Sequence, residues 1–227
     1  MNQKLIIAFV VLAMAFGSCS TTKIVRENNE WCDFWWGNES DIVNSRVLFI
    51  GNSIFRGYFP YALDELHDVI NCDRYSSSRS ITDPSLQKET EIALGKYNHV
   101  VIVFNNGLHG VHLSGTEYED GLRKYVKFLK SHKAKNCKLI YALTTPVASP
   151  QEGVKLDPEK NGIVLERNSI ARKIMKENNI EVIDLYALME PDLETYSVEK
   201  GNVHYNSKGY KRIAHVISEE VLKQIGR

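Results

Sequence analysis

The chain has 227 residues, of which 43% are hydrophobic and 25% charged, a composition typical of one globular domain. Its 28 basic and 28 acidic residues give a formal net charge of zero, and Lys and Arg form no run interleaved with aromatic residues. The balance argues against a nucleic-acid partner.

The first 19 residues, "MNQKLIIAFVVLAMAFGSC", have the pattern of an export signal. The apolar stretch from Leu5 to Phe16 is shorter than the roughly 20 residues that a membrane-spanning helix needs. Small residues directly before Cys19 resemble the lipobox of bacterial lipoproteins, although Phe16 stands where that motif prefers Leu. We therefore expect an exported, periplasm-facing lipoprotein, held to a membrane through Cys19. A simple cleaved signal or an uncleaved anchor is the alternative.

Residues 20–45 are predicted to be a polar tether followed by an aromatic lead-in segment. Trp31, Phe34, Trp35 and Trp36 lie close together in this segment. One interpretation is an exposed platform for a sugar or a membrane surface. We expect instead that these rings pack the segment onto the following domain, because large aromatic side chains are mostly buried.

From residue 46 onward, short runs rich in β-branched residues alternate with helical patterns. This alternation predicts one domain over residues 46–227, a three-layer α/β/α sandwich around a five-stranded parallel sheet. Ligands of such folds bind beyond the carboxyl ends of the strands. The predicted strands are 46–51, 72–77, 99–105, 138–145 and 180–185, and the predicted helices are 58–70, 82–96, 117–132, 160–178 and 207–226.

The cysteines and histidines indicate neither a metal site nor a redox site. Cys32, Cys72 and Cys137 are odd in number and have no C-x-x-C spacing. A disulfide is open to them in an oxidising compartment, but Cys72 and Cys137 begin apolar runs and are expected to be buried free thiols. His109 and His112 lack an acidic or Cys ligand nearby. No glycine-rich phosphate loop is present, so we expect no cofactor.

Residues with catalytic chemistry follow the predicted strands. Ser53 follows strand 46–51 at the start of a helix, where the helix dipole and free N–H groups favour a nucleophile, although a helix cap is the simpler interpretation. Asn105 and Asn106 end the third strand, where a side-chain amide could stabilise an oxyanion; Asn-Gly is also a common turn. His204, in a polar loop before the last helix, suits a general base.

Three segments, "FIGNSIFRGY", "VFNNGLHG" and "VHYNSKGY", resemble the first, third and last blocks of the SGNH hydrolases, the GDSL-like esterases and lipases with a flavodoxin-like fold. The resemblance covers residues 46–226. It implies that Ser53 is the nucleophile, His204 the base and Asn105 the oxyanion donor, with Asn106 a close competitor of Asn105.

The chain departs from this family at three positions, the mildest being Asn52, which stands where the first block has Asp and still offers hydrogen bonds. The oxyanion glycine of the second block has no clear counterpart, and the backbone N–H of Ser80 is our choice for its role. The family's Asp-x-x-His reads Gly201-Asn202-Val203-His204. We expect the backbone carbonyl of Gly201 to accept the Nδ1 proton of His204, with Glu199 as the alternative base-orienting group.

The resemblance implies a serine ester hydrolase that works by a Ser–His dyad with an asparagine oxyanion hole. The expected substrate is a small acyl ester, acetyl above all, on a carbohydrate; the carbohydrate follows only from the habits of exported bacterial members. The alternative is a non-catalytic cell-envelope binding lipoprotein on the same fold, in which Gly201 marks decay of the catalytic apparatus.

Overall fold

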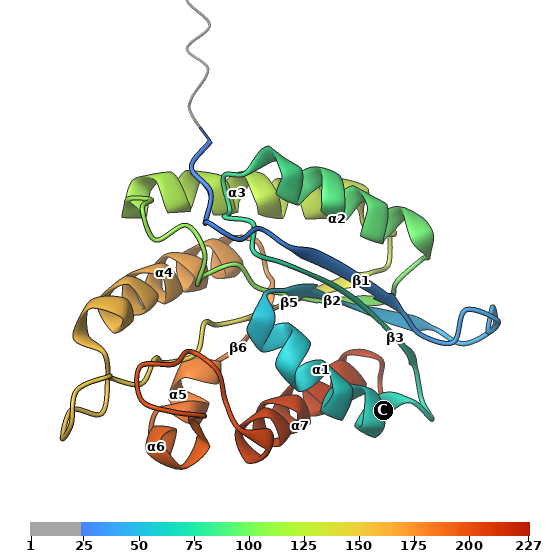
Figure 1. Cartoon of the computed structure of the whole chain (residues 1–227). Helices are drawn as coiled ribbons and strands as arrows, with labels where there is room; N and C mark the ends of the chain where they lie inside the picture. Colours follow the sequence, from blue (N-terminus) through green and yellow to red (C-terminus); the bar gives the residue numbers. More distant parts are fainter. Residues whose placement is uncertain (1–23) are drawn as a thin grey trace, which may run out of the picture.

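The computed structural model describes residues 24–227, so the predicted signal peptide and Cys19 lie outside the described residues. A central sheet has helices on both faces (Figure 1). Its strands are β1 (Cys32–Trp36), β2 (Arg46–Gly51), β3 (Asn71–Ser77), β4 (Val101–Phe104), β5 (Lys138–Ala142) and β6 (Glu181–Ile183). The helices are α1 (Ser53–Leu66), α2 (Pro84–Lys96), α3 (Gly115–His132), α4 (Pro158–Glu177), α5 (Leu185–Met189), α6 (Leu193–Tyr196) and α7 (Ser207–Gln224).

The predicted three-layer fold with five parallel strands is confirmed. The strand order is β1-β3-β2-β4-β5-β6, and the five strands from β2 to β6 pair in parallel. Strand β2 is buried along its whole length and sends alternate side chains to opposite faces. Val47 and Phe49 pack into the core beneath α1 and α7, whereas Leu48 and Ile50 pack into the core beneath α2, α3 and α4.

The sixth strand is a correction to the sequence analysis. The lead-in segment forms β1, which pairs antiparallel with β3 at the edge of the sheet. Its rings pack onto the domain as expected: Phe34 stacks on Tyr75 at 5.0 Å, and Trp35 meets Phe59 edge-on at 5.1 Å. A strand with consecutive aromatic residues lacks the apolar–polar alternation by which a half-buried strand is recognised. The aromatic segment is therefore part of the sheet.

Helix α1 begins earlier than predicted, at Ser53 instead of residue 58. Asn52 caps it, because its side-chain oxygen accepts a hydrogen bond from the backbone N–H of Ile54 at 2.9 Å. Gly51 is required just before this cap, since a Cβ there would lie 2.2 Å from the ring of Phe55. The tight approach of strand to helix places Ser53 at the carboxyl edge of the sheet.

A buried charged cluster joins the strands at the opposite edge. Asp73, at 0% exposure, accepts hydrogen bonds at 2.8 Å from Arg46, at 3.0 Å from the backbone of Gly37, and contacts His99 Nε2 at 3.0 Å. Burial raises the pKa of Asp73, but hydrogen bonds from Arg46, His99 and Gly37 outweigh it and hold the pKa below its ordinary value. This cluster ties the starts of three strands together, away from the catalytic candidates.

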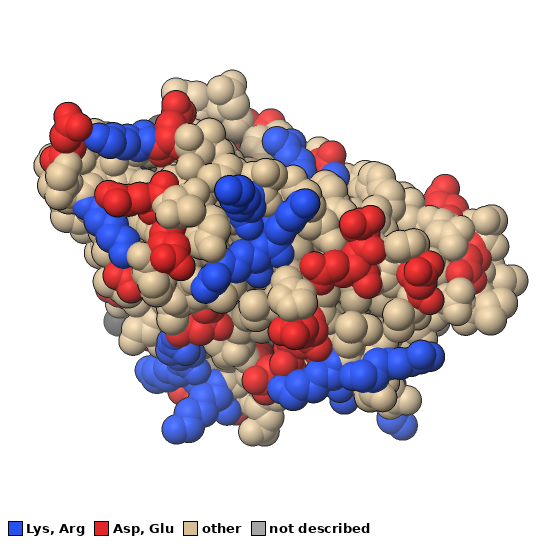
Figure 2. Space-filling model, turned by 90° about the horizontal axis from the view of Figure 1, so that it is seen from below, with Lys and Arg blue, Asp and Glu red and all other residues tan. Residues whose placement is uncertain are grey.

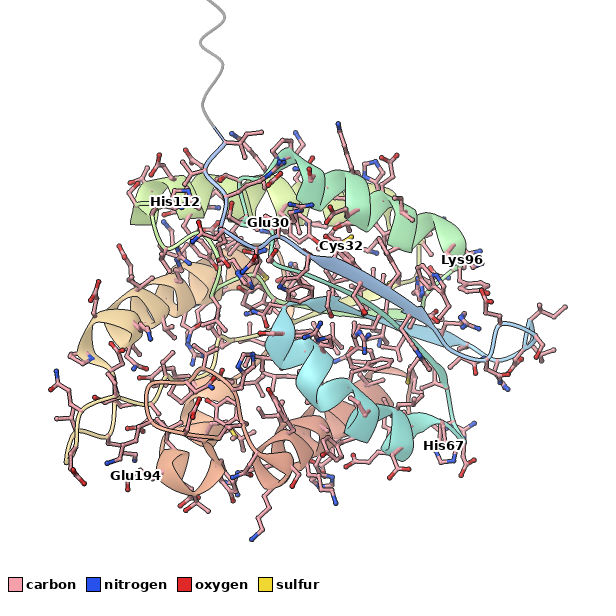
Figure 3. All side chains as sticks on the ribbon, in the orientation of Figure 1. Glu30, Cys32, His67, Lys96, His112 and Glu194 are labelled. Atoms are coloured by element: carbon pink, nitrogen blue, oxygen red, sulfur yellow. The ribbon has the colours of Figure 1, made fainter. Side chains whose placement is uncertain are left out.

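The described cysteines are free thiols. Cys72 and Cys137 are buried as expected, and Cys32 is exposed on β1 (Figure 3). Burial raises the pKa of the Cys72 thiol to about 12, which keeps it protonated and unreactive. No helix within residues 24–227 has both the length and the apolar content to cross a bilayer. On the face seen from below, basic and acidic side chains intermingle, so neither sign covers it (Figure 2).

Candidate active site

Ser53 and His204 meet at the carboxyl edge of the sheet, although 151 residues separate them. The Nε2 atom of His204 lies 2.9 Å from the Oγ atom of Ser53, within the distance at which a general base takes a proton. Ser53 is in the first turn of α1, where backbone N–H groups have no acceptor within the helix. Its own N–H is thus free to stabilise an oxyanion.

The surroundings of His204 favour the neutral imidazole that a base requires. Burial lowers the pKa of His204 below its ordinary value of 6.5, and the positive charge of Arg56 lowers it further. The side chain is half-buried in the loop between α6 and α7. At neutral pH, therefore, Nε2 is available to accept the Ser53 proton.

The partner of His204 Nδ1 is Asn202, which corrects the expectation for Gly201 and Glu199. Asn202 Oδ1 lies 2.8 Å from His204 Nδ1 and also accepts a hydrogen bond from the backbone N–H of His204 at 3.0 Å. The Gly201 carbonyl instead faces Lys160 Nζ, at 3.4 Å. Glu199 accepts a hydrogen bond from Asn202 Nδ2 at 3.0 Å and makes no described contact with His204.

A pocket of about 210 Å³ opens beside Ser53. Its walls come from the loop after β4, the loop after β5, the start of α4 and the residue preceding His204. They are largely aliphatic, formed by Leu108, Val111, Val147, Ile163, Val164 and Val203. Glu27, His109 and Lys160 bring polar atoms to it. This arrangement suits an apolar group attached to a polar or charged remainder.

The family model described as "GDSL-like Lipase/Acylhydrolase family" matches residues 44–212. The chain belongs to this family. Among curated proteins, none matches it significantly.

Solved structures of GDSL-like and esterase proteins share the fold. A GDSL-like lipase from Bacteroides thetaiotaomicron has a TM-score of 0.60 and 18% sequence identity, over 79% of this chain and 88% of that chain. The acetylxylan esterase Axe2 from Geobacillus stearothermophilus has a TM-score of 0.62 and 19% identity, over 81% of this chain and 94% of that chain. At such identities the likeness concerns the fold alone.

The two asparagines that resemble the oxyanion position of GDSL-like enzymes are engaged elsewhere. Asn105 Nδ2 donates to the Ala142 carbonyl at 2.8 Å and to Thr144 Oγ1 at 3.1 Å, which occupies both amide hydrogens. Asn106 Nδ2 donates to the Arg79 carbonyl at 2.8 Å. Asn105 therefore ties the end of β4 to the end of β5, and it could donate to a substrate only by giving up one of these contacts.

Ser80 is not brought to the pocket of Ser53. It lines a separate depression with Glu30 and Gly110, and its hydroxyl lies 3.4 Å from Thr82 Oγ1. The loop after β3 contacts the loop after β4, where Asn106 Nδ2 donates to the Arg79 carbonyl. The contact of Ser80 with Thr82 concerns its side chain, so the role of its backbone N–H as an oxyanion donor stays a prediction.

Arg167 on α4 is a residue of this GDSL-like site that the sequence analysis missed. Its guanidinium donates to three carbonyls of one loop, those of Gly107 at 3.0 Å, His109 at 2.9 Å and Gly110 at 2.6 Å. The side chain is 2% exposed, and its charge lies 4.8 Å from the centre of the Tyr118 ring. Burial lowers the pKa of Arg167, but a guanidinium stays charged in proteins. Arg167 thereby fixes one wall of the pocket.

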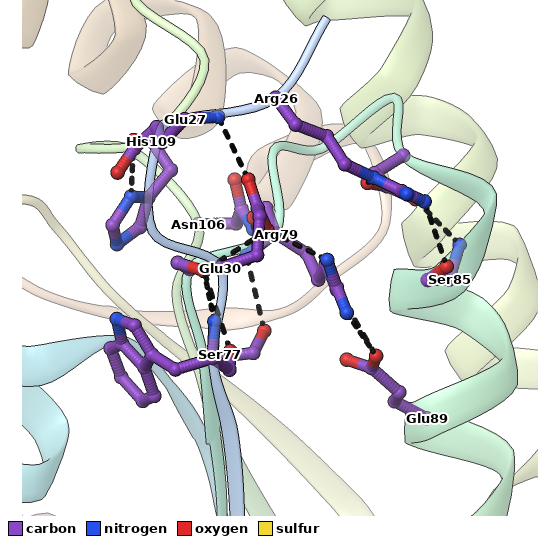
Figure 4. Close-up of polar contacts among 12 residues, drawn as sticks. Arg26, Glu27, Glu30, Ser77, Arg79, Ser85, Glu89, Asn106 and His109 are labelled. Atoms are coloured by element: carbon purple, nitrogen blue, oxygen red, sulfur yellow. Dashed lines mark hydrogen bonds and ion pairs between the residues drawn. The ribbon is translucent and has the colours of Figure 1, made fainter. Parts of the chain in front are cut away.

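The segment before β1 crosses the same edge of the sheet (Figure 4). Arg79, in the loop after β3, lies beside this segment and forms ion pairs with Glu30 at 2.7 Å and with Glu89 at 3.0 Å. Farther along, Glu27 contacts His109 Nδ1 at 2.7 Å. His109 therefore takes part in a structural contact at the pocket wall. Within residues 24–227, no group of three or more His, Cys, Asp or Glu side chains is arranged to hold a metal ion.

Proposed function

We propose that the protein is a serine esterase that hydrolyses small acyl esters, acetyl esters of carbohydrates first among them. The observation that carries the proposal is the 2.9 Å contact between Ser53 Oγ and His204 Nε2, with Nδ1 of the same ring hydrogen-bonded on its other side. A nucleophile within reach of an oriented base is the arrangement that acyl transfer requires.

The reaction follows from these atoms in two steps. Ser53 Oγ attacks the ester carbonyl while its proton passes to His204 Nε2, and the imidazolium then protonates the leaving alcohol. Water next attacks the acyl-serine, giving its proton to the same nitrogen, and the imidazolium then protonates Ser53 Oγ as the C–O bond breaks and the acid is released. The backbone N–H of Ser53 stabilises the oxyanion, joined by Asn105 if its amide turns from Thr144 to the substrate.

The pocket supports a short acyl group. Its volume of about 210 Å³ is below the roughly 300–1,000 Å³ of sites that bury a drug-sized ligand, and its walls are aliphatic. The choice of acetyl on a carbohydrate is supported by the name of a structural neighbour, the acetylxylan esterase from Geobacillus stearothermophilus. Export and a lipid anchor at Cys19 are part of the proposal, supported by residues 1–19. Metabolic labelling with a fatty-acid analogue tests that anchor.

The decisive test is the Ser53→Ala variant. We expect the wild-type chain to release acetate from acetylated xylan or aryl acetates, and Ser53→Ala to release none above background. Ser207→Ala is the matched control, because Ser207 is also the first residue of a helix but is exposed at the start of α7.

A fluorophosphonate probe should label wild-type Ser53 and leave the Ser53→Ala variant unlabelled. Persistent activity in Ser53→Ala would refute the nucleophile. Absence of labelling and of hydrolysis at every pH would favour a binding protein on this fold. Hydrolysis of longer acyl esters only, with acetyl esters inert, would refute the choice of substrate.

A further inference from the structure

We propose that Asn202, held in place by Glu199, is the positioning residue that sets the tautomer of the His204 base, in the role that aspartate has elsewhere in the family. This inference rests on the proposed esterase function. Three hydrogen bonds form a continuous chain from Glu199 through Asn202 and His204 to Ser53, with lengths of 3.0, 2.8 and 2.9 Å.

The partners of Asn202 decide which end of its amide faces His204. The backbone N–H of His204 can only donate, and it lies 3.0 Å from Oδ1. The carboxylate of Glu199 is an acceptor, and its Oε1 lies 3.0 Å from Nδ2. A flipped amide would put two donors face to face at one end and two acceptors at the other. Only one orientation of Asn202 satisfies both neighbours.

That orientation in turn decides where the imidazole carries its proton. Oδ1 of Asn202 is an acceptor, so the His204 nitrogen at 2.8 Å from it, Nδ1, must donate. The lone pair of the neutral ring is then on Nε2, which faces Ser53 Oγ. During the reaction the Oγ–H bond breaks and the Nε2–H bond forms, while Nδ1–H stays with Asn202 Oδ1. The protein thus holds the catalytically competent tautomer before substrate binds.

The backbone of the loop explains why the support comes from residue 202. Asn202 N donates to the Glu199 carbonyl at 3.3 Å, which closes a turn with Gly201 in the third position at φ +75°. The loop is closed again where Val198 N donates to the His204 carbonyl at 3.1 Å. This folded turn directs the Gly201 carbonyl toward Lys160 and brings the side-chain oxygen of Asn202 to Nδ1 at the edge of the ring.

An amide and a carboxylate support the ring to different degrees. Both accept the Nδ1 proton, but only a carboxylate brings a full negative charge to the imidazolium that forms in the transition state. Glu199 is exposed, and its charge reaches the ring only through the Asn202 amide. We therefore expect Asn202→Asp to strengthen the base, and removal of the Asn202 side chain to weaken it.

The test compares Asn202→Ala, Asn202→Asp and wild type in the full chain, with an aryl acetate as the substrate. In Asn202→Ala we expect kcat to fall about tenfold, with KM within about twofold, because positioning acts in the transition state. In Asn202→Asp we expect kcat at or above wild type, and the acidic limb of the kcat/KM profile to move up by roughly half a pH unit or more. Because the new carboxylate would raise the pKa of His204 in either case, the tautomer of the ring is the readout that separates positioning from a merely structural role.

Glu199 variants test the second link of the chain. Glu199→Gln keeps an oxygen acceptor for Asn202 Nδ2 but adds a competing donor, so it should lower kcat less than Glu199→Ala, for which we expect a loss of about two- to threefold because the amide is no longer locked. In the Asn202→Asp background, Glu199→Gln should raise kcat by removing the facing like charge. Lys200→Ala is the control, because Lys200 lies in the same turn and is exposed.

Nitrogen-15 NMR of His204 gives a readout independent of activity. Above neutral pH the wild type should show Nδ1 protonated and Nε2 unprotonated, and Asn202→Ala should show a mixture of tautomers. A wild-type ring protonated on Nε2, or an Asn202→Ala variant with wild-type kcat and an unmoved acidic limb, would overturn the inference. A chain without esterase activity or fluorophosphonate labelling would overturn the proposed function instead, and the NMR result would still decide the tautomer.

Discussion

Two regions flank Ser53, and they are built in different ways. The turn from Glu199 to His204 is short and local, and its side chains are exposed or half-buried. The loop from Asn105 to Gly110 is held by distant segments: Arg167 of α4 binds its carbonyls across 57 to 60 residues of sequence, and Asn105 reaches across to β5. The His204 ring is supported by one turn, whereas the pocket wall is supported by the core.

This difference teaches where sequence change is tolerated. In an exposed turn, a neighbouring residue can take over a hydrogen bond that supports another side chain, because water satisfies the polar groups that lose their partner. A buried loop has no such freedom, because each carbonyl that loses its donor stays unsatisfied. The family's aspartate position is a glycine here, yet His204 still has a partner at 2.8 Å. We expect no equivalent substitution to be tolerated in the buried loop from Asn105 to Gly110.

The largest effect is expected from Arg167→Met, which removes the hydrogen bonds that hold the buried loop. Methionine keeps most of the volume of the side chain but leaves the carbonyls of Gly107, His109 and Gly110 without their donor. We expect the free energy of unfolding to fall by about 2–4 kcal/mol, measured by urea titration. Because the pocket wall moves, kcat/KM for an aryl acetate should fall about a hundredfold.

Arg172→Met is the matched control for this prediction. Arg172 is also on α4, but its side chain is 49% exposed and pairs with Asp184 at the surface. Its removal should cost less than about 1 kcal/mol and leave activity unchanged. If Arg167→Met were as stable and as active as Arg172→Met, the contrast between a buried and an exposed support would fail.

A smaller effect is expected from Gly201→Asp, which places an aspartate at the position used elsewhere in the family. Gly201 has a φ of +75°, and a Cβ on it would lie 3.0 Å from the Cβ of Pro150. We expect a loss of stability on the order of 1–2 kcal/mol from strain in the left-handed conformation. Activity should not rise, because the turn directs residue 201 away from the ring. Thermal unfolding and kcat measured beside Asn202→Asp test this. A stable Gly201→Asp variant with a strengthened base would show that the turn adapts.

The fold could be predicted from the sequence because its signals are periodic and local. Strands such as 46–51 are continuous apolar runs, and helices such as 207–226 repeat apolar residues every three or four positions. Strand β1 was missed because its residues, Phe34 to Trp36 among them, show no alternation and pair with β3 only at the edge of the sheet. Edge strands depend on tertiary contacts more than on their own pattern.

The site could be predicted only where a motif names the residue. Ser53 and His204 were found from their blocks, and the structure brings them within 2.9 Å of each other. Asn202 was missed because the choice between a carbonyl and a neighbouring side chain depends on the φ of Gly201, which no motif encodes. Arg167 was missed because its partners are backbone carbonyls, which every sequence contains and none reveals.

The smallest effect is expected from Arg56→Gln, which removes a charge near the exposed turn that holds His204. Arg56 is exposed, its guanidinium lies 4.8 Å from the centre of the Trp31 ring, and its charge adds to burial in lowering the pKa of His204. Removing the charge should raise that pKa. The base works only when neutral, so the acidic limb of kcat/KM should move to higher pH, and activity below pH 6.5 should decrease.

The size of this shift follows from solvent screening. An exposed charge acts through water and salt, so we expect a few tenths of a pH unit at low ionic strength and almost none at about 1 M salt, where the Debye length is about 3 Å. The control is Arg212→Gln, another exposed arginine over an aromatic ring, 5.5 Å from the centre of the Tyr196 ring. A shift that survives high salt would mean that Arg56 acts on His204 through structure. The turn from Glu199 to His204 would then not be a purely local support of the ring.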